Sequence, residues 1–327
     1  MDTLTAKLKN HLPILAMPAL LIAVELGALL LTLPVQVSGI VAFEDPTSME
    51  NPLIFIVILL VFTAFLLVLI KHNLKKVIGA VITIAIFLTF VYIFAAMVFA
   101  ATGATAVATT EWWEAVLPAV VVYSTTIETI VATGIIIVLS VLATALLYKY
   151  PEWYVIDGLG ILLGAGVAAI FGASLEILPV CLLLVLLAVY DAISVYKTKH
   201  MITLAEGVID LKTPILFVIP KRKDYSFIKE GIGKLNDGGE RAAFIIGMGD
   251  MIMPAILVVS ANVFCGGVKY FGFINLPALG AIIGSLAGLA VLMHFVMSGK
   301  PQAGLPPLNG GTIIGFFIGF ALIGGFA

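Results

Sequence analysis

Long apolar runs separated by shorter polar connections dominate the pattern of this chain. A helix that crosses a bilayer needs about 20 consecutive, mostly apolar residues. Runs that meet or approach this length occur nine times, so the pattern predicts an all-α polytopic membrane protein with nine transmembrane helices. We place these helices at 13–35, 53–70, 77–101, 123–148, 158–173, 178–196, 242–264, 273–297 and 305–326.

Composition narrows the classes of function. Of the 327 residues, 62% are hydrophobic and 11% are charged, whereas about a quarter of the residues in a soluble domain are charged. A net charge of −2 leaves no basic surplus for phosphates, so we expect no nucleic-acid partner. Cys181 and Cys265 lie far apart without metal-ligand spacing, so we expect no disulfide framework, no metal site and no cofactor.

Basic residues predict the orientation of the helices. Apart from Lys269, every Lys and Arg falls in the N-terminal segment or in connections on one side of the predicted membrane. Cytoplasmic connections carry such an excess. We therefore expect the N-terminus in the cytoplasm and the C-terminus outside, with one long cytoplasmic loop at 197–240.

Ionisable side chains inside spanning helices are candidates for function, because burying each one costs at least a few kcal/mol. The candidates are Glu25, Glu128, Asp191, Asp250 and His294, whereas we expect Asp157 and Glu176 to contact water near helix ends. At 1.5 Å per residue, Asp191 lies about 9 Å and Asp250 about 13 Å from the same cytoplasmic end. Their helices are consecutive and antiparallel, so we expect the two carboxylates to meet.

A pair of carboxylates in a low dielectric shares one proton, which is the chemistry of an aspartic protease. The ionised group acts as a general base on water, and the protonated group donates to the developing oxyanion and then to the leaving nitrogen. The alternative is a proton-coupled secondary transporter that uses the same aspartates as a relay. We expect an internal repeat in such a transporter, and we see none, so we favour the protease.

Short motifs surround both aspartates and open the last helix. Glycines before Asp250 remove side-chain bulk and let an extended substrate backbone approach. The candidate supporting residues of the active site are Tyr190, Gly247, Gly249, Pro306, Pro307 and Leu308. We therefore divide the chain into a scaffold of helices 1 to 5, at 1–173, and a catalytic half of helices 6 to 9, at 174–327.

Together, Tyr190-Asp191, Gly247-x-Gly249-Asp250 and Pro306-Pro307-Leu308 resemble the YD, GxGD and PAL motifs of the presenilin and signal peptide peptidase family of intramembrane aspartyl proteases. The resemblance implies that Asp191 and Asp250 are the catalytic pair and that 306–308 shapes the active site. Pro307 departs from the usual Ala. The implied substrates are transmembrane helices of membrane proteins, or remnant signal peptides, within the lipid bilayer.

The compact chain is similar to archaeal members of that family, which implies the plasma membrane of an archaeon. A cytoplasmic N-terminus resembles the presenilin branch, whereas Pro254 resembles the signal peptide peptidases. The sequence leaves the oligomeric state open, a homo-oligomer included.

The long loop contains an apolar run between Pro214 and Pro220 that is rich in strand-forming residues, so we predict a short strand there. A substrate helix must unwind before cleavage, and pairing as an edge strand would satisfy its freed backbone groups. An interfacial anchor is the alternative explanation of this run. The residues of the candidate substrate strand are Ile215, Leu216, Phe217 and Val218.

Overall fold

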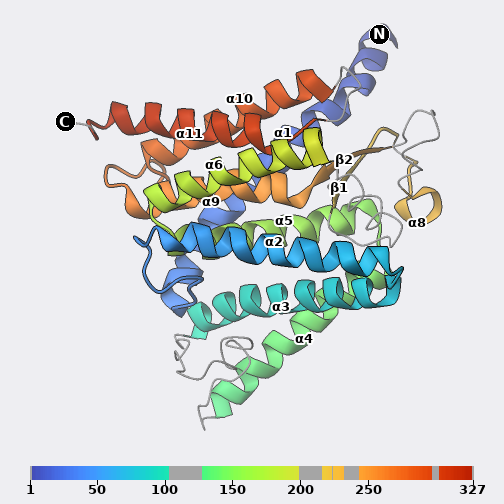
Figure 1. Ribbon diagram of the computed structural model, residues 1–327, viewed down its shortest axis with the longest axis horizontal. Coiled ribbons are helices and arrows are strands. Elements are labelled where there is room, and N and C mark those ends of the chain that lie inside the picture. The colour runs from blue at the N-terminus through green and yellow to red at the C-terminus, as the bar shows by residue number, and fades with distance from the viewer. Residues whose placement is uncertain are drawn as a thin grey trace.

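The computed structural model describes residues 2–102, 127–198, 216–222, 224–231, 243–296 and 302–325. Within these ranges, eight helices are long and apolar enough to cross a membrane. They are α1 (Asp2–Ser38), α2 (Glu50–Lys71), α3 (Lys75–Thr102), α4 (Ile127–Lys149), α5 (Trp153–Ser174), α6 (Ile177–Ile193), α10 (Leu276–Val296) and α11 (Leu305–Leu322). A shorter apolar helix, α9 (Met248–Phe264), completes the bundle, which confirms the all-α polytopic membrane protein (Figure 1).

One predicted helix begins at the wrong place. The residues 243–247 were included in the helix at 242–264, but they form strand β2 (Ala243–Gly247), and α9 begins only at Met248. This strand pairs antiparallel with β1 (Leu216–Pro220), with Phe217 opposite Ile246 and Val218 opposite Ile245. The sequence Ala-Phe-Ile-Ile-Gly suits either structure by hydropathy alone, and a partner strand decides between them.

The predicted strand in the long loop is confirmed for 216–220, while Ile215 lies outside the described residues. Strands β1 and β2 lie at one end of the bundle, near the start of α5 and the short helix α8 (Phe227–Glu230) (Figure 1). This end also holds the turn of π-helix that follows α6, Ser194–Thr198.

Helix α5 has the largest buried share of the candidate spans, and it packs against both α1 and α9. It begins at Trp153, five residues before the predicted start at 158, so Asp157 lies inside the helix. Our expectation that Asp157 contacts water was wrong, because its side chain is only 8% exposed and faces β1.

Helices α10 and α11 approach each other through glycines on both sides. A Cβ on Gly284 would overlap the carbonyl of Gly311, and one on Gly288 would overlap the carbonyl of Pro307. Small residues at such an interface bring helix backbones together where lipid offers no hydrophobic driving force. This packing holds the start of α11 against α10.

Two other ionisable candidates take different environments. Glu25 of α1 is fully buried beside Ser285 of α10. His294 is exposed on the last turn of α10. The side chain of Glu128 lies outside the described residues.

Candidate active site

Asp191 lies two residues before the end of α6, and its side chain is 8% exposed. Its Oδ2 atom accepts a hydrogen bond of 3.0 Å from the backbone N–H of Leu305, the first residue of α11. The Ser194 hydroxyl donates to the Asp191 carbonyl at 2.9 Å, where the chain passes into the π-helical turn. Single π-helical turns often occur at functional sites.

Asp250 is the third residue of α9 and is half-buried. Gly247 is the last residue of β2 and the N-cap of α9, so the strand leads directly into the turn that carries Asp250. The carboxylates of Asp250 and Asp191 interact electrostatically. The structure therefore brings the two predicted aspartates together at the junction of α6, α9 and α11.

Asp250 lies in the first turn of its helix and not two turns inside it, as we expected from the sequence. Residues 243–247, which we predicted to be helical, are extended. The carboxylates approach because α6 and α9 pack against each other and α11 packs against both.

The backbone of residues 304–305, where α11 begins, lies close to both aspartates, and sequence reasoning missed it. Leu305 binds Asp191, and a Cβ on the preceding Gly304 would lie 2.8 Å from Oδ2 of Asp250. Gly304 has φ −80° and ψ −40°, which any residue adopts, so the close approach to Asp250 explains this glycine. The glycine directly before Leu305 and Pro306 was the available sequence signal.

A tyrosine holds this segment in place. The Tyr196 hydroxyl donates to Oε1 of Gln302 at 2.9 Å and accepts from the N–H of Ala303 at 3.3 Å. Tyr196 lies in the π-helical turn that follows Asp191, so one short stretch of chain carries both the aspartate and this anchor. No spacing rule would have singled out Tyr196.

The three residues of the predicted PAL-like motif open α11. Pro306 lies in the first turn, where a missing N–H costs nothing. The Pro307 carbonyl packs on Gly288 of α10, and Leu308 is fully buried. Next to them, the Asn309 amide donates to the Leu184 carbonyl at 2.9 Å and ties α11 to α6, two turns before Asp191.

The remaining motif residues differ in their surroundings. Tyr190 is partly buried beside Asp191 on α6. Gly249 is exposed, and a Cβ placed there would meet no described atom within 4 Å. Space next to Asp250 is thus available at Gly249, where a substrate backbone would need it.

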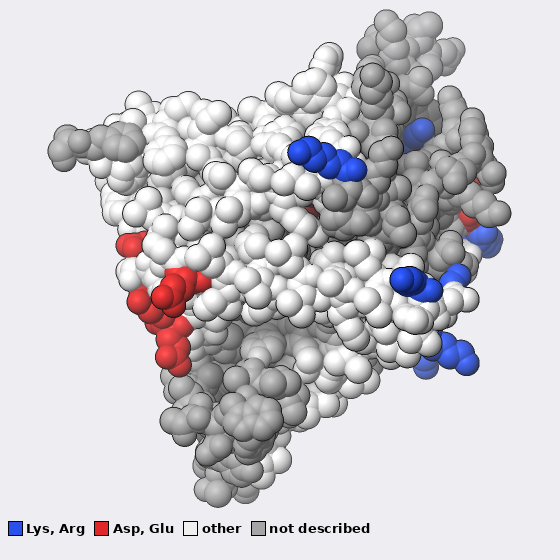
Figure 2. Space-filling view, viewed as in Figure 1, with Lys and Arg blue, Asp and Glu red and all other residues white. Residues whose placement is uncertain are grey.

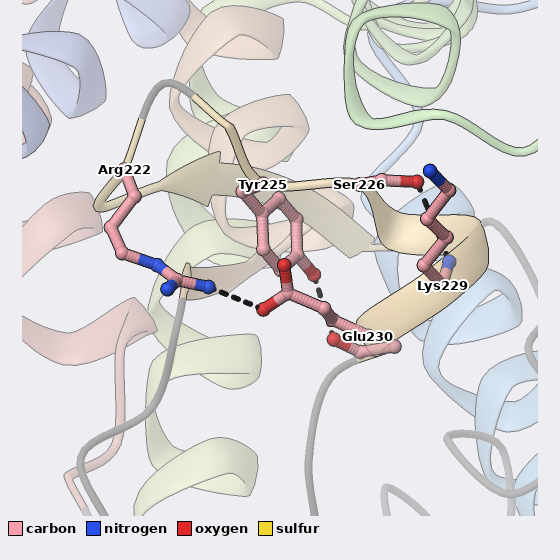
Figure 3. Close-up of polar contacts among 6 residues, drawn as sticks. Arg222, Tyr225, Ser226, Lys229 and Glu230 are labelled. Carbon is pink, nitrogen blue, oxygen red and sulfur yellow. Dashed lines mark hydrogen bonds and ion pairs between the residues drawn. The ribbon is translucent and has the colours of Figure 1, made fainter.

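The loop beyond β1 folds into a small cap around α8. Arg222 pairs with Glu230 at 2.6 Å, the Tyr225 hydroxyl donates to the Gly231 carbonyl, and Ser226 accepts from the N–H of Lys229 (Figure 3). Burial, together with the nearby carboxylates of Glu230 and Glu152, raises the pKa of Tyr225 to about 12. This cap fixes the chain that continues from the sheet.

No cluster of three or more His, Cys, Asp or Glu side chains suited to a metal ion occurs among the described residues.

The chain is similar to known proteins in sequence and in fold. The family model described as signal-peptide peptidase, presenilin aspartyl protease matches residues 18–127 and 105–325. A solved structure of a presenilin family intramembrane aspartate protease in space group C222 is 46% identical, with a TM-score of 0.65, and the match covers 95% of this chain and 99% of that chain.

A second structure of a presenilin family intramembrane aspartate protease, in space group P2, is 47% identical with a TM-score of 0.63. That match covers 95% of this chain and 98% of the other. No curated protein sequence matches the chain.

Proposed function

This chain belongs to the signal peptide peptidase and presenilin family of aspartyl proteases, and we propose that Asp191 and Asp250 are the catalytic pair with which it cleaves transmembrane segments. Membership makes the protein an intramembrane aspartic endopeptidase. The comparisons support this activity and give no support to the alternative of a proton-coupled transporter.

The proposed mechanism needs one proton on the pair of carboxylates. The ionised carboxylate takes a proton from water as the water oxygen bonds to the peptide carbonyl carbon, while the protonated one donates to the carbonyl oxygen. Collapse of the tetrahedral intermediate breaks the C–N bond, and a proton passes to the leaving nitrogen. The observation that supports this proposal is that the Leu305 N–H binds Asp191 while Gly304 leaves no room for a side chain beside Asp250.

The backbone of 304–305 would take part in substrate binding. Leu305 N–H now binds Asp191, so a substrate in the site meets this amide beside the reacting carboxylate. An unwound substrate exposes backbone groups that need partners inside the membrane. The segment held by Tyr196 is therefore a proposed wall of the site.

The two-stranded sheet offers the place where an unwound substrate would pair. In an antiparallel ladder, alternate residues point their N–H and C=O away from the partner strand. Since Val218 N–H points to Asp157, the opposite residue Ile245 directs its own groups to the outer edge of β2. No described residue hydrogen-bonds to this edge. We propose that substrate adds there, with Leu216, Phe217 and Val218 as the inner strand.

Charge supports the orientation that we propose. The visible Lys and Arg side chains lie toward the end that carries the sheet, and a group of Asp and Glu lies at the opposite end (Figure 2). Cytoplasmic loops are the basic ones. We propose a cytoplasmic N-terminus and an active site near the cytoplasmic leaflet of an archaeal plasma membrane.

Cleavage of a single-span substrate in proteoliposomes tests the proposed function. The purified protein should release two products, and Asp191→Asn and Asp250→Asn should each remove product while leaving the melting temperature in detergent close to that of the unsubstituted protein. Asparagine keeps the shape and removes the acid and base. A variant that still cleaves at an undiminished rate would exclude that aspartate from the pair.

A further inference from the structure

The N-terminal end of α5 carries two carboxylates that hold the long loop. Asp157 Oδ1 accepts a hydrogen bond of 2.8 Å from the backbone N–H of Val218 in β1. Glu152, the residue before α5, accepts from the Ser226 hydroxyl at 2.6 Å and from the N–H of Phe227 at 3.1 Å. The N-terminal end of α5 is thus hydrogen-bonded both to β1 and to the start of α8, which is shown in Figure 3.

The bond from Asp157 closes one edge of the sheet. Val218 N–H is an edge donor that would otherwise be open to another strand. Both β1 and Asp157 are buried there, with Val218 at 1% and Asp157 at 8% exposure. By contrast, four of the five residues of β2 are partly exposed. Pairing is therefore directed away from β1 and toward β2.

The same face of α5 also contacts the start of α9. Gly160 lies one turn after Asp157, and a Cβ there would be 3.0 Å from the ring of Phe217 and 2.8 Å from the Met248 methyl. One turn further, a Cβ on Gly164 would lie 3.4 Å from Ile252. This face of α5 therefore packs against β1 and against Met248 and Ile252, which lie two residues before and two residues after Asp250.

We propose that Asp157 is a positioning residue that fixes the register of the sheet relative to Asp250, and with it the peptide bond that is cut. The inference rests on the proposed function, because the sheet matters in this way only if substrate pairs with β2. A strand whose pairing slips by one residue turns every side chain to the other face. Without its anchor at Val218, β1 can shift along α5, and β2 shifts with it.

Four variants test the anchor from both sides. Asp157→Asn keeps an oxygen acceptor, and Asp157→Leu has similar branching but no acceptor. Val218→Pro removes the N–H, which faces away from β2, and proline is tolerated where an N–H does not enter the ladder. Val218→Ala loses side-chain packing but keeps the N–H, so it is the matched control for the proline.

The readouts are the masses of the cleavage products, kcat, KM and the melting temperature, all on the full chain in proteoliposomes or detergent. We expect Asp157→Asn and Val218→Ala to cut the same bond as the unsubstituted protein. We expect Asp157→Leu and Val218→Pro to cut neighbouring bonds as well, with KM raised about tenfold, the size expected for one lost buried hydrogen bond.

The double variant Asp157→Leu/Val218→Pro separates positioning from stability. Each single variant leaves a buried polar group unpaired, whereas the double variant removes donor and acceptor together, which is often nearly neutral for stability. It should melt closer to the unsubstituted protein than either single variant and still cut several bonds.

Two results would overturn the inference. A single, unchanged cleavage position with unchanged KM in Asp157→Leu and Val218→Pro would show that this bond does not set the register. Recovery of one cleavage position in the double variant would assign the effect to stability alone. Failure of the proposed function looks different, because the unsubstituted protein would then release no product at all.

Discussion

Replacing Gly304 by Ala should separate activity from stability. A Cβ at this position would lie 2.8 Å from Oδ2 and 3.1 Å from Cγ of Asp250, whereas ordinary contacts begin at 3.4 Å. The carboxylate or the start of α11 must therefore withdraw by about 0.6 Å. A misplacement of about 1 Å at a reacting group can reduce the rate about a hundredfold, so we expect kcat to fall about tenfold.

The stability of Gly304→Ala should change little. Gly304 has helical backbone angles, so Ala restricts the unfolded chain at no backbone cost, which typically adds about 0.4–1 kcal/mol and offsets part of the cost of displacing Asp250. The assay is kcat on a single-span substrate alongside the melting temperature in detergent. Gly310→Ala is the matched control, because a Cβ on Gly310 meets nothing within 4 Å. Unchanged kcat in Gly304→Ala would refute the argument that Gly304 confines Asp250.

Three further predictions concern the surroundings of the pair. Tyr196→Phe loses both hydrogen bonds to residues 302–303, so kcat should fall about fivefold with little change in melting temperature. Unchanged kcat would show that Tyr196 does not position the segment that borders the site. Gly284→Leu forces α10 and α11 apart and should lower the free energy of unfolding by about 1–3 kcal/mol in a denaturation assay. Ile283→Leu, at an exposed position on the same helix, is the control and should leave it unchanged. Since folding raises the pKa of Tyr225 to about 12, its contribution to stability is complete below pH 10 and is lost as the pH rises toward 12. The absorbance titration of Tyr225→Phe should therefore lack a step near pH 12.

Sequence reasoning found the spans and the aspartates because both leave local signals. Apolar runs of spanning length mark the helices, and an aspartate inside such a run stands out. The motifs beside Asp191 and Asp250 then indicated the family. The pairing of the two aspartates was right, although its argument from depth assumed a helix where β2 lies.

The missed residues act through partners that are distant in the sequence. Asp157 was placed in water because it lies just before the helix predicted at 158–173, but Val218, which follows 61 residues later, binds its carboxylate. Gly304 and Leu305 gain their roles only when α11 meets α6 and α9. Hydropathy and spacing describe neighbours along the chain, so they do not reveal contacts of this kind.

The replacement of a helix by a strand at 243–247 also changes how the site can work. As a helix, these residues would bond their own backbone and offer nothing to an unwound substrate. As a strand at about 3.3 Å per residue, they present along one edge N–H and C=O groups that no described residue binds, and they lead directly into the turn that holds Asp250. Pairing at β2 would then deliver an extended segment beside the proposed catalytic carboxylate. Under this proposal, the sheet would link the recognition of an unwound substrate to the bond that is cut.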